Sequence, residues 1–271
     1  MPTLSDVQIV TVAYNSSAVV GSMLASVPEG VSVVIVDNGS TDTDALAQVA
    51  DTHGAKLIRN EENLGFGAAC NIGAAEGDRS WLFFVNPDAV LQPGCVEELC
   101  KAASAGDVVS AFSPRVLDGK GGQAFRRRSR LMPRVDRWNG PSPEQDSDVP
   151  LLNGAAIFVE WSHFQGVRGF DESIFLYHED DDLSLRLKHA YGPIRHVHNA
   201  VVHHAEGHST ERTPEVAALK ATHMAQSAVY TMKKHSRMLP GPRVVTQAAL
   251  QMLSPLTWIS ARKRAKSFGF L

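Results

Sequence analysis

Cysteine is scarce in this chain of 271 residues, and the signatures of secretion and membrane insertion are missing. The three cysteines, Cys70, Cys95 and Cys100, form no CxxC pair and no even set, which argues against a disulfide framework and favours a reduced, cytoplasmic setting. Residues 1–12 contain no basic segment followed by a long apolar one, so we expect no signal peptide. No apolar run is long enough to cross a bilayer.

An excess of positive charge is also missing. The chain has 26 lysines and arginines against 29 aspartates and glutamates, a formal net charge of −3, and few aromatic residues interleave with its basic run. These features disfavour a nucleic-acid partner. The length fits one large domain, or one domain with an appendage.

Short apolar runs alternate with helical patterns over the first hundred residues. Residues 31–36 (VSVVIV) are a nearly unbroken β-branched run, which is typical of a strand covered on both faces. The pattern predicts strands at 7–12, 31–36, 56–59 and 81–85, and helices at 18–26, 44–53, 68–75 and 94–103. This alternation predicts an α/β fold with a mostly parallel open sheet and flanking helices.

The pattern changes after Ser113. Residues 118–150 are rich in Gly, Pro, Ser, Asp and Arg, which predicts a long irregular segment. We then expect a strand at 155–160, a helix from the acidic run to Ala190, one or two strands within 194–202, and a helix at 214–234. The predicted organisation is a main domain at 1–213 and a C-terminal helical appendage with a basic end at 214–271.

Polar residues stand where three of the predicted strands end. Thr11, Tyr14 and Asn15 belong to the first strand end, residues 37–42 (DNGSTD) to the second, and residues 86–88 (NPD) to the fourth. Each set alone is ordinary turn chemistry. Because ligands bind at the carboxyl ends of strands in open α/β sheets, their joint placement favours a binding site.

The segment 60–71 (NEENLGFGAACN) brings glycines close to the same edge. We expect Asn63 to cap the following helix and Gly65 to let a ligand approach the backbone. The segment is not a GxGxxG after the first strand, and no Gly-Lys-Ser/Thr follows it. A classical dinucleotide fold is therefore disfavoured, and a P-loop is not present.

An acidic run opens the helix predicted after Tyr177, with Glu179, Asp180, Asp181 and Asp182 in succession. Helical spacing puts Asp180 on the stripe of Leu183, Leu187 and Ala190 that should face the interior, and points Asp181 elsewhere. Acids in a first helical turn also complement the helix dipole, which explains one or two of them. A carboxylate on a buried stripe needs partners or a chemical role.

Asp88 at a strand end and Asp180 at a helix start fit two complementary roles. A hard divalent cation binds through one or two carboxylates together with substrate phosphates, which suits Asp88. A carboxylate held apart from the metal acts as a general base, which suits Asp180. This division fits displacement at a sugar carbon with a diphosphate leaving group.

The ordered set of these motifs resembles glycosyltransferase family 2, whose members are inverting enzymes of the GT-A (Rossmann-like) fold that use nucleotide-sugar donors. The rhamnosyltransferase-like branch, in which Asn-Pro-Asp replaces Asp-x-Asp, is particularly similar. The matching pieces span most of residues 7–210: VTVAYNS, VIVDNGSTD, NEENLGFGAACNIG, FVNPDAVLQPG, LLNGAAIFVE, GFDESIFLYHEDDDLSLRL and VVHHAEGHST. Any one piece is weak evidence, whereas the ordered set is specific.

The resemblance implies a role for each matching position. The donor nucleotide would contact Asp37, Thr11 and Tyr14, with Asn38, Asn63, Gly65 and Asn86 lining the same pocket. Asp88 and His204 would hold Mg or Mn against the diphosphate, with His203 a close second to His204. Asp180 would be the base, with Glu179 binding the acceptor hydroxyl or acting as the base itself. Asp181 stands at a variable position and receives no role.

The resemblance also implies a class of reaction and partners. A sugar, rhamnose or another hexose, would pass from a nucleotide-diphosphate donor to a hydroxyl of a saccharide or lipid-linked saccharide in cell-surface polysaccharide or glycolipid synthesis. A deoxythymidine-diphosphate rhamnose donor is the first expectation and a uridine-diphosphate sugar the second. Two rival functions stay open, a nucleotidyltransferase of sugar-nucleotide metabolism and a non-catalytic nucleotide-sugar-binding module.

Two basic regions and a histidine pair carry open alternatives. The arginines 126, 127, 128, 130, 134 and 137 are either a solvated loop or a contact for acceptor or donor phosphates, and we favour phosphate. The tail, with Trp258, Phe268, Phe270 and four basic residues from Arg262 to Lys266, fits a peripheral contact at the inner membrane face, packing on the main domain, or a homodimer. His196 and His198 share a strand face, but no Cys or HExxH accompanies them, so a structural role is favoured over zinc.

Overall fold

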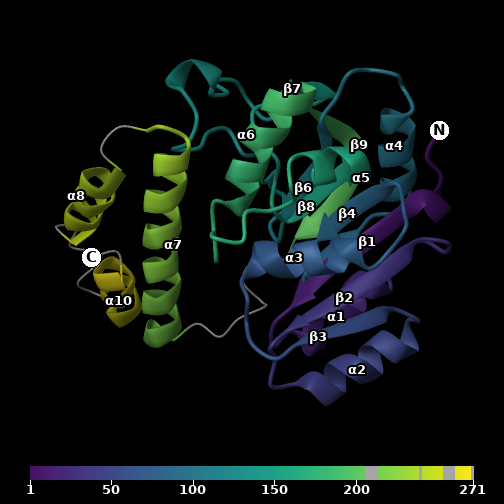
Figure 1. The fold of residues 1–271 in the computed structure, drawn as a ribbon, viewed down its shortest axis with the longest axis horizontal. Coiled ribbons are helices and arrows are strands. Elements are labelled where there is room, and N and C mark those ends of the chain that lie inside the picture. Colours follow the sequence, from purple (N-terminus) through teal and green to yellow (C-terminus); the bar gives the residue numbers. More distant parts are fainter. Residues whose placement is uncertain (205–212, 238–239, 253–259, 270–271) are drawn as a thin grey trace.

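The computed structural model describes residues 1–204, 213–237, 240–252 and 260–269. Figure 1 shows a twisted sheet with helices on both of its faces, and three further helices that lie beside this body. The strand order within the sheet is β3-β2-β1-β4-β8-β6-β9-β5, and β7 pairs with β9 off this path.

The N-terminal half of the sheet is parallel, as the sequence predicts. Its strands are β1 (Val7–Ala13), β2 (Ser32–Asn38), β3 (Lys56–Asn60) and β4 (Trp81–Val85). The connecting helices are α1 (Ser17–Leu24), α2 (Thr43–Thr52) and α3 (Phe66–Ala75). Every residue of β1 is buried, because the strand is central and covered on both faces.

The second half of the sheet is mixed, and the sequence analysis resolved it only in part. β8 (Ala156–Glu160) runs antiparallel to β4, and β6 (Ala111–Asp118) runs parallel to β9 (Ile194–His204). Two short strands, β5 (Ala89–Leu91) and β7 (Ser147–Val149), pair antiparallel to β9. β5, β6 and β7 were not predicted. β6 contains Pro114, which weakens a strand signal, and β5 and β7 have only three residues each. The rest of 118–150 is irregular except for a 3₁₀ turn at Arg134–Asp136.

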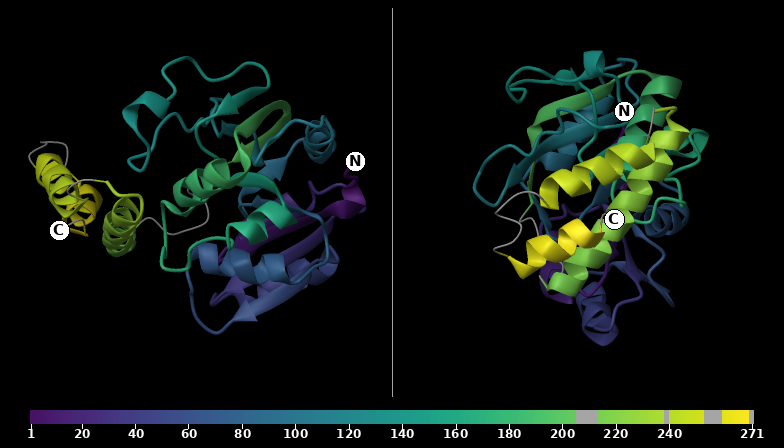
Figure 2. Two further views of the ribbon diagram at one scale, coloured as in Figure 1. Left: turned by 45° about the horizontal axis from the view of Figure 1, so that its top comes forward. Right: turned by 90° about the vertical axis from the view of Figure 1, so that its left-hand side faces the viewer.

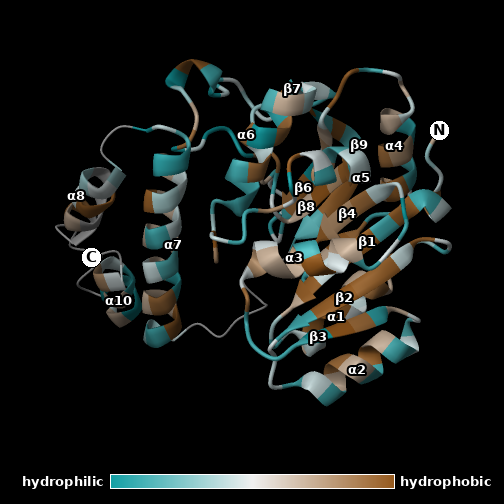
Figure 3. Ribbon diagram, viewed as in Figure 1, coloured by the Kyte–Doolittle hydropathy of each residue, from teal (hydrophilic) through white to brown (hydrophobic). Residues whose placement is uncertain are grey.

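Alternate residues of each strand point to opposite faces of the sheet, and each face is covered by its own set of helices. Ile9 belongs to the core under α1, α2 and α4 (Cys95–Ala103), whereas Val10 belongs to the core under α3, α5 (Trp161–Gly166) and α6 (Glu179–Tyr191). Apolar residues accordingly concentrate in the central strands in Figure 3. The predicted stop of α6 is confirmed, since the helix ends at Tyr191 and Gly192 has a φ of 100°.

Three helices make up the described C-terminal part of the chain, α7 (Pro214–Lys234), α8 (Pro240–Met252) and α10 (Ala261–Gly269). α7 lies beside α6, and α8 and α10 lie on the side of α7 that faces away from α6 (Figure 2). Thr213 caps α7 by accepting a hydrogen bond from the Val216 N–H at 3.2 Å, and Pro214 occupies the first helical position as predicted. None of the described helices combines the length and the apolar character needed to span a bilayer. Trp258 and Phe270 of the predicted tail lie outside the described residues.

Candidate functional site

The ends of β1 and β2 lie side by side at the carboxyl edge of the parallel strands. The register pairs Ala13 with Asp37, so Tyr14 follows directly beside the Asp37 turn. Tyr14 is 41 % exposed, whereas Thr11 is fully buried and Asp37 shows 1 % of its surface. The Asp37 carboxylate accepts the Ser40 N–H at 2.9 Å, which is the turn chemistry expected of this motif. Tyr14 is thus open to a ligand, and the contacts expected of Thr11 and Asp37 with a nucleotide stay predictions.

Asn38 organises the loop that follows β3. Its amide donates to the Asn63 side chain at 2.9 Å and to the Gly65 carbonyl at 3.2 Å, and its oxygen accepts from Asn60 and Leu64. All of its hydrogen-bonding groups are engaged, so Asn38 positions the loop and has no group to spare for a ligand. Asn63 accepts from the Gly65 N–H but is not the N-cap of α3, which is Gly65, so the predicted capping role is wrong.

Gly65 is needed for a contact within the chain. Its φ is 91°, and a Cβ there would lie 2.5 Å from the Phe175 carbonyl oxygen. The same carbonyl accepts the Phe66 N–H at 3.2 Å. The sequence analysis expected a ligand to approach the backbone at Gly65. In the structure, residues 170–178, the segment that leads into the acidic helix, approach the backbone at this position.

Asp88 and His204 are brought together by the pairing of β5 with β9. The register sets Ala89 opposite His204, which places the preceding Asp88 within reach of the imidazole. His204 Nε2 lies 3.1 Å from the Asp88 carboxylate and 3.3 Å from the Asn86 amide nitrogen. His203 is exposed on the other side of the strand, so His204 is the histidine of this cluster.

The start of α6 is built on an unusual backbone. Tyr177 and His178 both have positive φ, 66° and 71°, a conformation that costs free energy for bulky residues and concentrates at functional sites. The turn directs the acids inward: Asp180, Asp181 and Asp182 are all buried, as are Leu183 and Leu187. The expectation that Asp181 points away from the interior is therefore wrong, and Ala190 of the predicted stripe is exposed.

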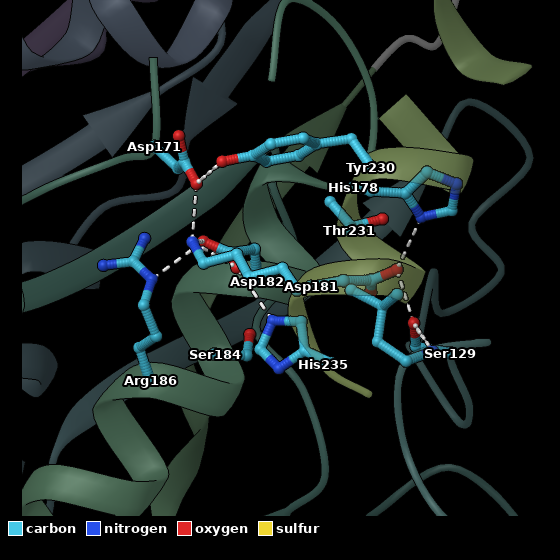
Figure 4. A network of polar contacts seen from close by, with 12 residues as sticks. Ser129, Asp171, His178, Asp181, Asp182, Ser184, Arg186, Tyr230, Thr231 and His235 are labelled. Carbon is cyan, nitrogen blue, oxygen red and sulfur yellow. Dashed lines mark hydrogen bonds and ion pairs between the residues drawn. The ribbon is translucent and has the colours of Figure 1, made fainter. Parts of the chain in front are cut away.

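Two of the buried acids are fully engaged by other side chains (Figure 4). Asp181 accepts from His178 at 3.1 Å and from Ser129 at 2.7 Å, and it pairs with Arg126 at 2.5 Å. Asp182 pairs with Arg186, Lys234 and His235 at 2.8 Å each. Asp181 thus joins α6 to residues 126–129, and Asp182 joins it to the end of α7, which are structural roles that the sequence analysis missed.

Glu179 and Asp180 are the acids that remain for chemistry. Asp180 accepts the Asp181 N–H at 2.9 Å and lies 3.7 Å from the Arg126 guanidinium. One Glu179 carboxyl oxygen is buried without a hydrogen-bond partner. Burial and the charges of Asp180 and Asp181 raise the pKa of Glu179 to about 8. Burial also raises the pKa of Asp180, although Arg126 opposes this shift.

The other acids of α6 shift in the opposite direction. Burial acts to raise the pKa of Asp181, but the His178 hydrogen bond and the Arg126 charge outweigh it and the pKa falls. Burial likewise acts to raise the pKa of Asp182. The contacts of Asp182 with His235, Arg186 and Lys234 outweigh this effect and lower the pKa to about 2. A neutral Glu179 thus stands on the same helical turn as Asp181 and Asp182, which remain ionised at neutral pH.

Residues 153–156 contact both Asp180 and the turn that holds Asn86. The Asp180 carboxylate lies against Gly154, where an added Cβ would meet its oxygen at 3.1 Å. The next carbonyl, of Ala155, accepts the Asn86 N–H at 3.0 Å. Asn153 accepts from the Ala155 N–H and donates to the Ala124 carbonyl at 2.7 Å. Asp180 and Asn86 therefore flank one short segment, and Asn153, which no prediction named, fixes it.

The histidine pair of β9 behaves as a structural feature. His196 is buried and its ring meets that of His198 at a centroid distance of 6.1 Å. Burial and the neighbouring His198 lower the pKa of His196 to about 4. Over the described ranges, no group of three His, Cys, Asp or Glu side chains has the geometry of a metal site. Within the described residues, Asp88 and His204 alone are too few to complete such a site.

Residues 8–166 match the protein-family model described as "Glycosyl transferase family 2". An N-acetylglucosaminyl-diphospho-decaprenol L-rhamnosyltransferase of Mycobacterium tuberculosis is 30 % identical over 95 % of this chain and 94 % of its own length. The family match covers the parallel strands of the N-terminal half and ends before α6.

Solved structures share the fold at low sequence identity. A mannosyltransferase from Pyrobaculum calidifontis in complex with GDP-Man and Mn2+ superposes with a TM-score of 0.57 at 13 % identity, covering 97 % of this chain and 85 % of its own. GalNAc-T7 with UDP, GalNAc and Mn2+ superposes with a TM-score of 0.65 at 14 % identity, covering 97 % and 54 %. The mixed sheet with its flanking helices is thus the GT-A arrangement.

Proposed function

Because the chain belongs to glycosyltransferase family 2 and transfers a sugar from a nucleotide sugar, we propose that it is a metal-assisted, inverting enzyme that glycosylates a lipid-linked saccharide. The observation that carries the proposal is the arrangement around residues 153–156. The Asp180 carboxylate lies against Gly154 of this segment, and Asn86, next to the Asp88–His204 pair, is hydrogen-bonded to the Ala155 carbonyl. The reaction needs one site for the leaving group and another for the attacking group, with a short distance between them.

In this proposal the donor nucleotide lies over the ends of β1 and β2. Tyr14 is 41 % exposed, and Asp37 lies at the end of the neighbouring strand, paired with Ala13. Asn38, Asn63 and Gly65 act indirectly, because their hydrogen bonds fix the loop after β3. Thr11 underlies the pocket from its buried position.

Asp88 and His204 would hold the divalent cation. One carboxylate and one imidazole suit Mn²⁺ or Mg²⁺ bound mainly through substrate phosphates, which supply the missing ligands. When bound, the ion would neutralise charge that develops on the leaving diphosphate. The Asn86 amide nitrogen lies 3.3 Å from His204 Nε2, the same ring nitrogen that faces Asp88, and adds a polar group beside the proposed ion.

Asp180 acts as the general base. As the acceptor oxygen attacks the anomeric carbon, its proton passes to the Asp180 carboxylate and the bond from that carbon to the diphosphate oxygen breaks. A single displacement of this kind inverts the configuration at the anomeric carbon. Glu179 is protonated at neutral pH because its pKa is about 8, so it serves as a hydrogen-bond donor to the acceptor.

The relative from M. tuberculosis supports the choice of substrates. Its name specifies an L-rhamnosyl group as the transferred sugar and a sugar diphospho-lipid as the acceptor. Similarity over 95 % of the chain, including α6 and α7, supports an acceptor of the same kind here. Rhamnose is accordingly the first sugar to test.

The test is a transfer assay with the purified chain, Mn²⁺ or Mg²⁺, and a panel of nucleotide sugars led by dTDP-rhamnose. The proposal expects release of a nucleoside diphosphate together with a new glycoside of inverted configuration, read by NMR. Pyrophosphate release from a nucleoside triphosphate would identify a nucleotidyltransferase instead. Binding of nucleotide sugars without turnover under every condition would identify a binding module.

A further inference from the structure

A pocket of about 530 Å³ opens beside the acidic helix, between residues 125–137 and the start of α6. Its volume is in the range of small-molecule sites. The lining is unusually basic, with five arginines against one carboxylate: Phe125, Arg126, Arg127, Arg128, Ser129, Arg130, Arg137, His178 and Asp181.

The positive charge of this arginine pocket is largely uncompensated. Arg126 is neutralised by Asp181 and Asp180. Arg127 donates to the Gly140 carbonyl and the Ser142 hydroxyl, which are neutral partners. Arg128, Arg130 and Arg137 form no ion pair with any acid of the described residues. Several guanidinium groups gathered at one pocket repel one another unless an anion joins them.

Unsatisfied donors point to the same conclusion. The Nε atoms of Arg126 and Arg137 are buried without a hydrogen-bond partner within the described part of the chain. A buried N–H that lacks an acceptor is costly, which makes these groups candidates for ligand contacts. Guanidinium groups bind phosphate oxygens through paired hydrogen bonds, and phosphate is the anion that arginine clusters recognise best.

The wall of the pocket is fixed by the rest of the protein. The Ser129 hydroxyl donates to Asp181, and the Arg237 guanidinium donates to the Leu131 carbonyl at 2.6 Å. The Trp138 N–H donates to the Arg127 carbonyl at 2.9 Å. Because the backbone of this irregular segment is already held at several points, it does not have to be ordered when a ligand binds, which saves free energy of binding.

We propose that the arginine pocket binds the phosphate groups of the acceptor, and thereby selects an acceptor that is a phosphate or diphosphate ester. The inference rests on the proposed function. Arg126 reaches from the pocket to Asp180, so an anion held there lies next to the general base, where the acceptor hydroxyl must enter. In the proposed function the donor diphosphate has its own partners at Asp88 and His204, neither of which lines the arginine pocket.

The first test uses inorganic pyrophosphate as the probe, with EDTA present so that the metal-dependent donor site does not contribute. Calorimetry should show binding to the wild-type chain, weakened about tenfold or more in Arg130→Gln and in Arg128→Gln, because each removes a charge-assisted contact. Arg134→Gln is the matched control, since Arg134 is exposed on the same segment but does not line the pocket. Equal affinity in all four proteins would overturn the proposal.

Nucleotide binding separates the acceptor site from a donor site. With Mn²⁺ present, Arg130→Gln should bind the nucleoside diphosphate as the wild type does, and pyrophosphate should still bind to the nucleotide-loaded protein. Weaker nucleotide binding in Arg130→Gln, or displacement of pyrophosphate by the nucleotide, would assign the pocket to the donor and overturn the proposal.

Transfer kinetics then test selectivity. A sugar diphosphoalkyl acceptor should have a kcat/KM at least about tenfold above that of the matching uncharged alkyl glycoside, and Arg130→Gln should reduce this ratio toward one. Equal kcat/KM for both acceptors in the wild type would overturn the inference while leaving the glycosyltransferase proposal intact. Absence of transfer to either acceptor, with the pyrophosphate result as expected, would instead count against the proposed function alone.

Discussion

The Lys234 ammonium group at the end of α7 lies 2.8 Å from the Asp182 carboxylate, whose side chain is completely buried at the start of α6. Lys234 also contacts Asp171 at 2.6 Å, in the segment that leads into α6. These ion pairs therefore connect α7 to the start of α6, the helix that carries Glu179 and Asp180. The predicted boundary at residue 213 separates chain segments that cooperate at the site.

The first prediction concerns this buried carboxylate. Asp182→Asn leaves Lys234, Arg186 and His235 without their common partner, so we expect a loss of about 3 kcal/mol in the free energy of unfolding. Urea denaturation measures it, with Asp51→Asn on the exposed face of α2 as control. An unchanged denaturation midpoint would show that the network contributes no stability.

The same carboxylate predicts a dependence on acid pH. The contacts of Asp182 lower its pKa to about 2 in the folded protein, from 3.8, so its stabilising effect is complete above pH 4 and is lost as pH falls toward 2. The wild type should therefore lose more stability than Asp182→Asn between pH 5 and pH 3. Parallel losses in the two proteins would contradict this assignment.

Glu179 predicts a dependence of the opposite sign. Its pKa is raised to about 8 in the folded state from 4.5, so the folded protein holds a proton that the unfolded chain releases, and stability falls as pH rises from 4.5 to 8. We expect Glu179→Gln to remove a large part of this fall and to be more stable than the wild type by a few kcal/mol at pH 8.5. Urea denaturation at pH 5 and pH 8.5 measures the effect, with the exposed Glu61→Gln as control.

The parallel half of the fold was predictable from sequence because buried strands carry a dense local signal. VSVVIV marks β2 by itself, and the turns after β1, β2 and β4 contain the polar residues at the sheet edge. β5 and β7, with three residues each, carry no such signal, since their pairing is set by contacts with the distant β9. The pairing of Asp88 with His204 depends on that register, and only the family resemblance pointed to it.

The acidic run shows a different limit of sequence reasoning. Helical periodicity separates faces only when the helix lies on a surface, but α6 is covered by the sheet on one side and by α7 and residues 126–131 on others. Asp181 and Asp182 are therefore buried as deeply as Asp180. Their partners Ser129, Lys234 and His235 are 52 or more positions away in sequence, beyond any local pattern.

The assignment of the base leads to a kinetic prediction. Asp180→Asn keeps the shape of the side chain and removes its proton-accepting charge, so kcat should fall about 10²- to 10⁴-fold. Affinity for the donor nucleotide should stay within about twofold, because the base acts on the acceptor in the transition state. Transfer at near wild-type rate in Asp180→Asn, measured by product formation, would rule out this base.

The donor pocket is tested by Asp37. Asp37→Ala removes the carboxylate at the end of β2, so nucleotide affinity measured by calorimetry should weaken about tenfold or more if Asp37 bonds the nucleotide. Asp44→Ala, on the exposed first turn of the adjacent α2, is the matched control. Equal affinity in the wild type and Asp37→Ala would move the nucleotide site away from the end of β2.

Two adjacent histidines give the sharpest test of the metal site. His204 lies 3.1 Å from Asp88, whereas His203 is exposed on the same strand, so the two differ in position but not in chemistry. His204→Ala should raise the Mn²⁺ concentration for half-maximal transfer about tenfold or more, since a ligand is lost. His203→Ala should leave it unchanged. Equal metal dependence in both variants would show that His204 is not a metal ligand, and Asp88 would be the remaining candidate of this pair.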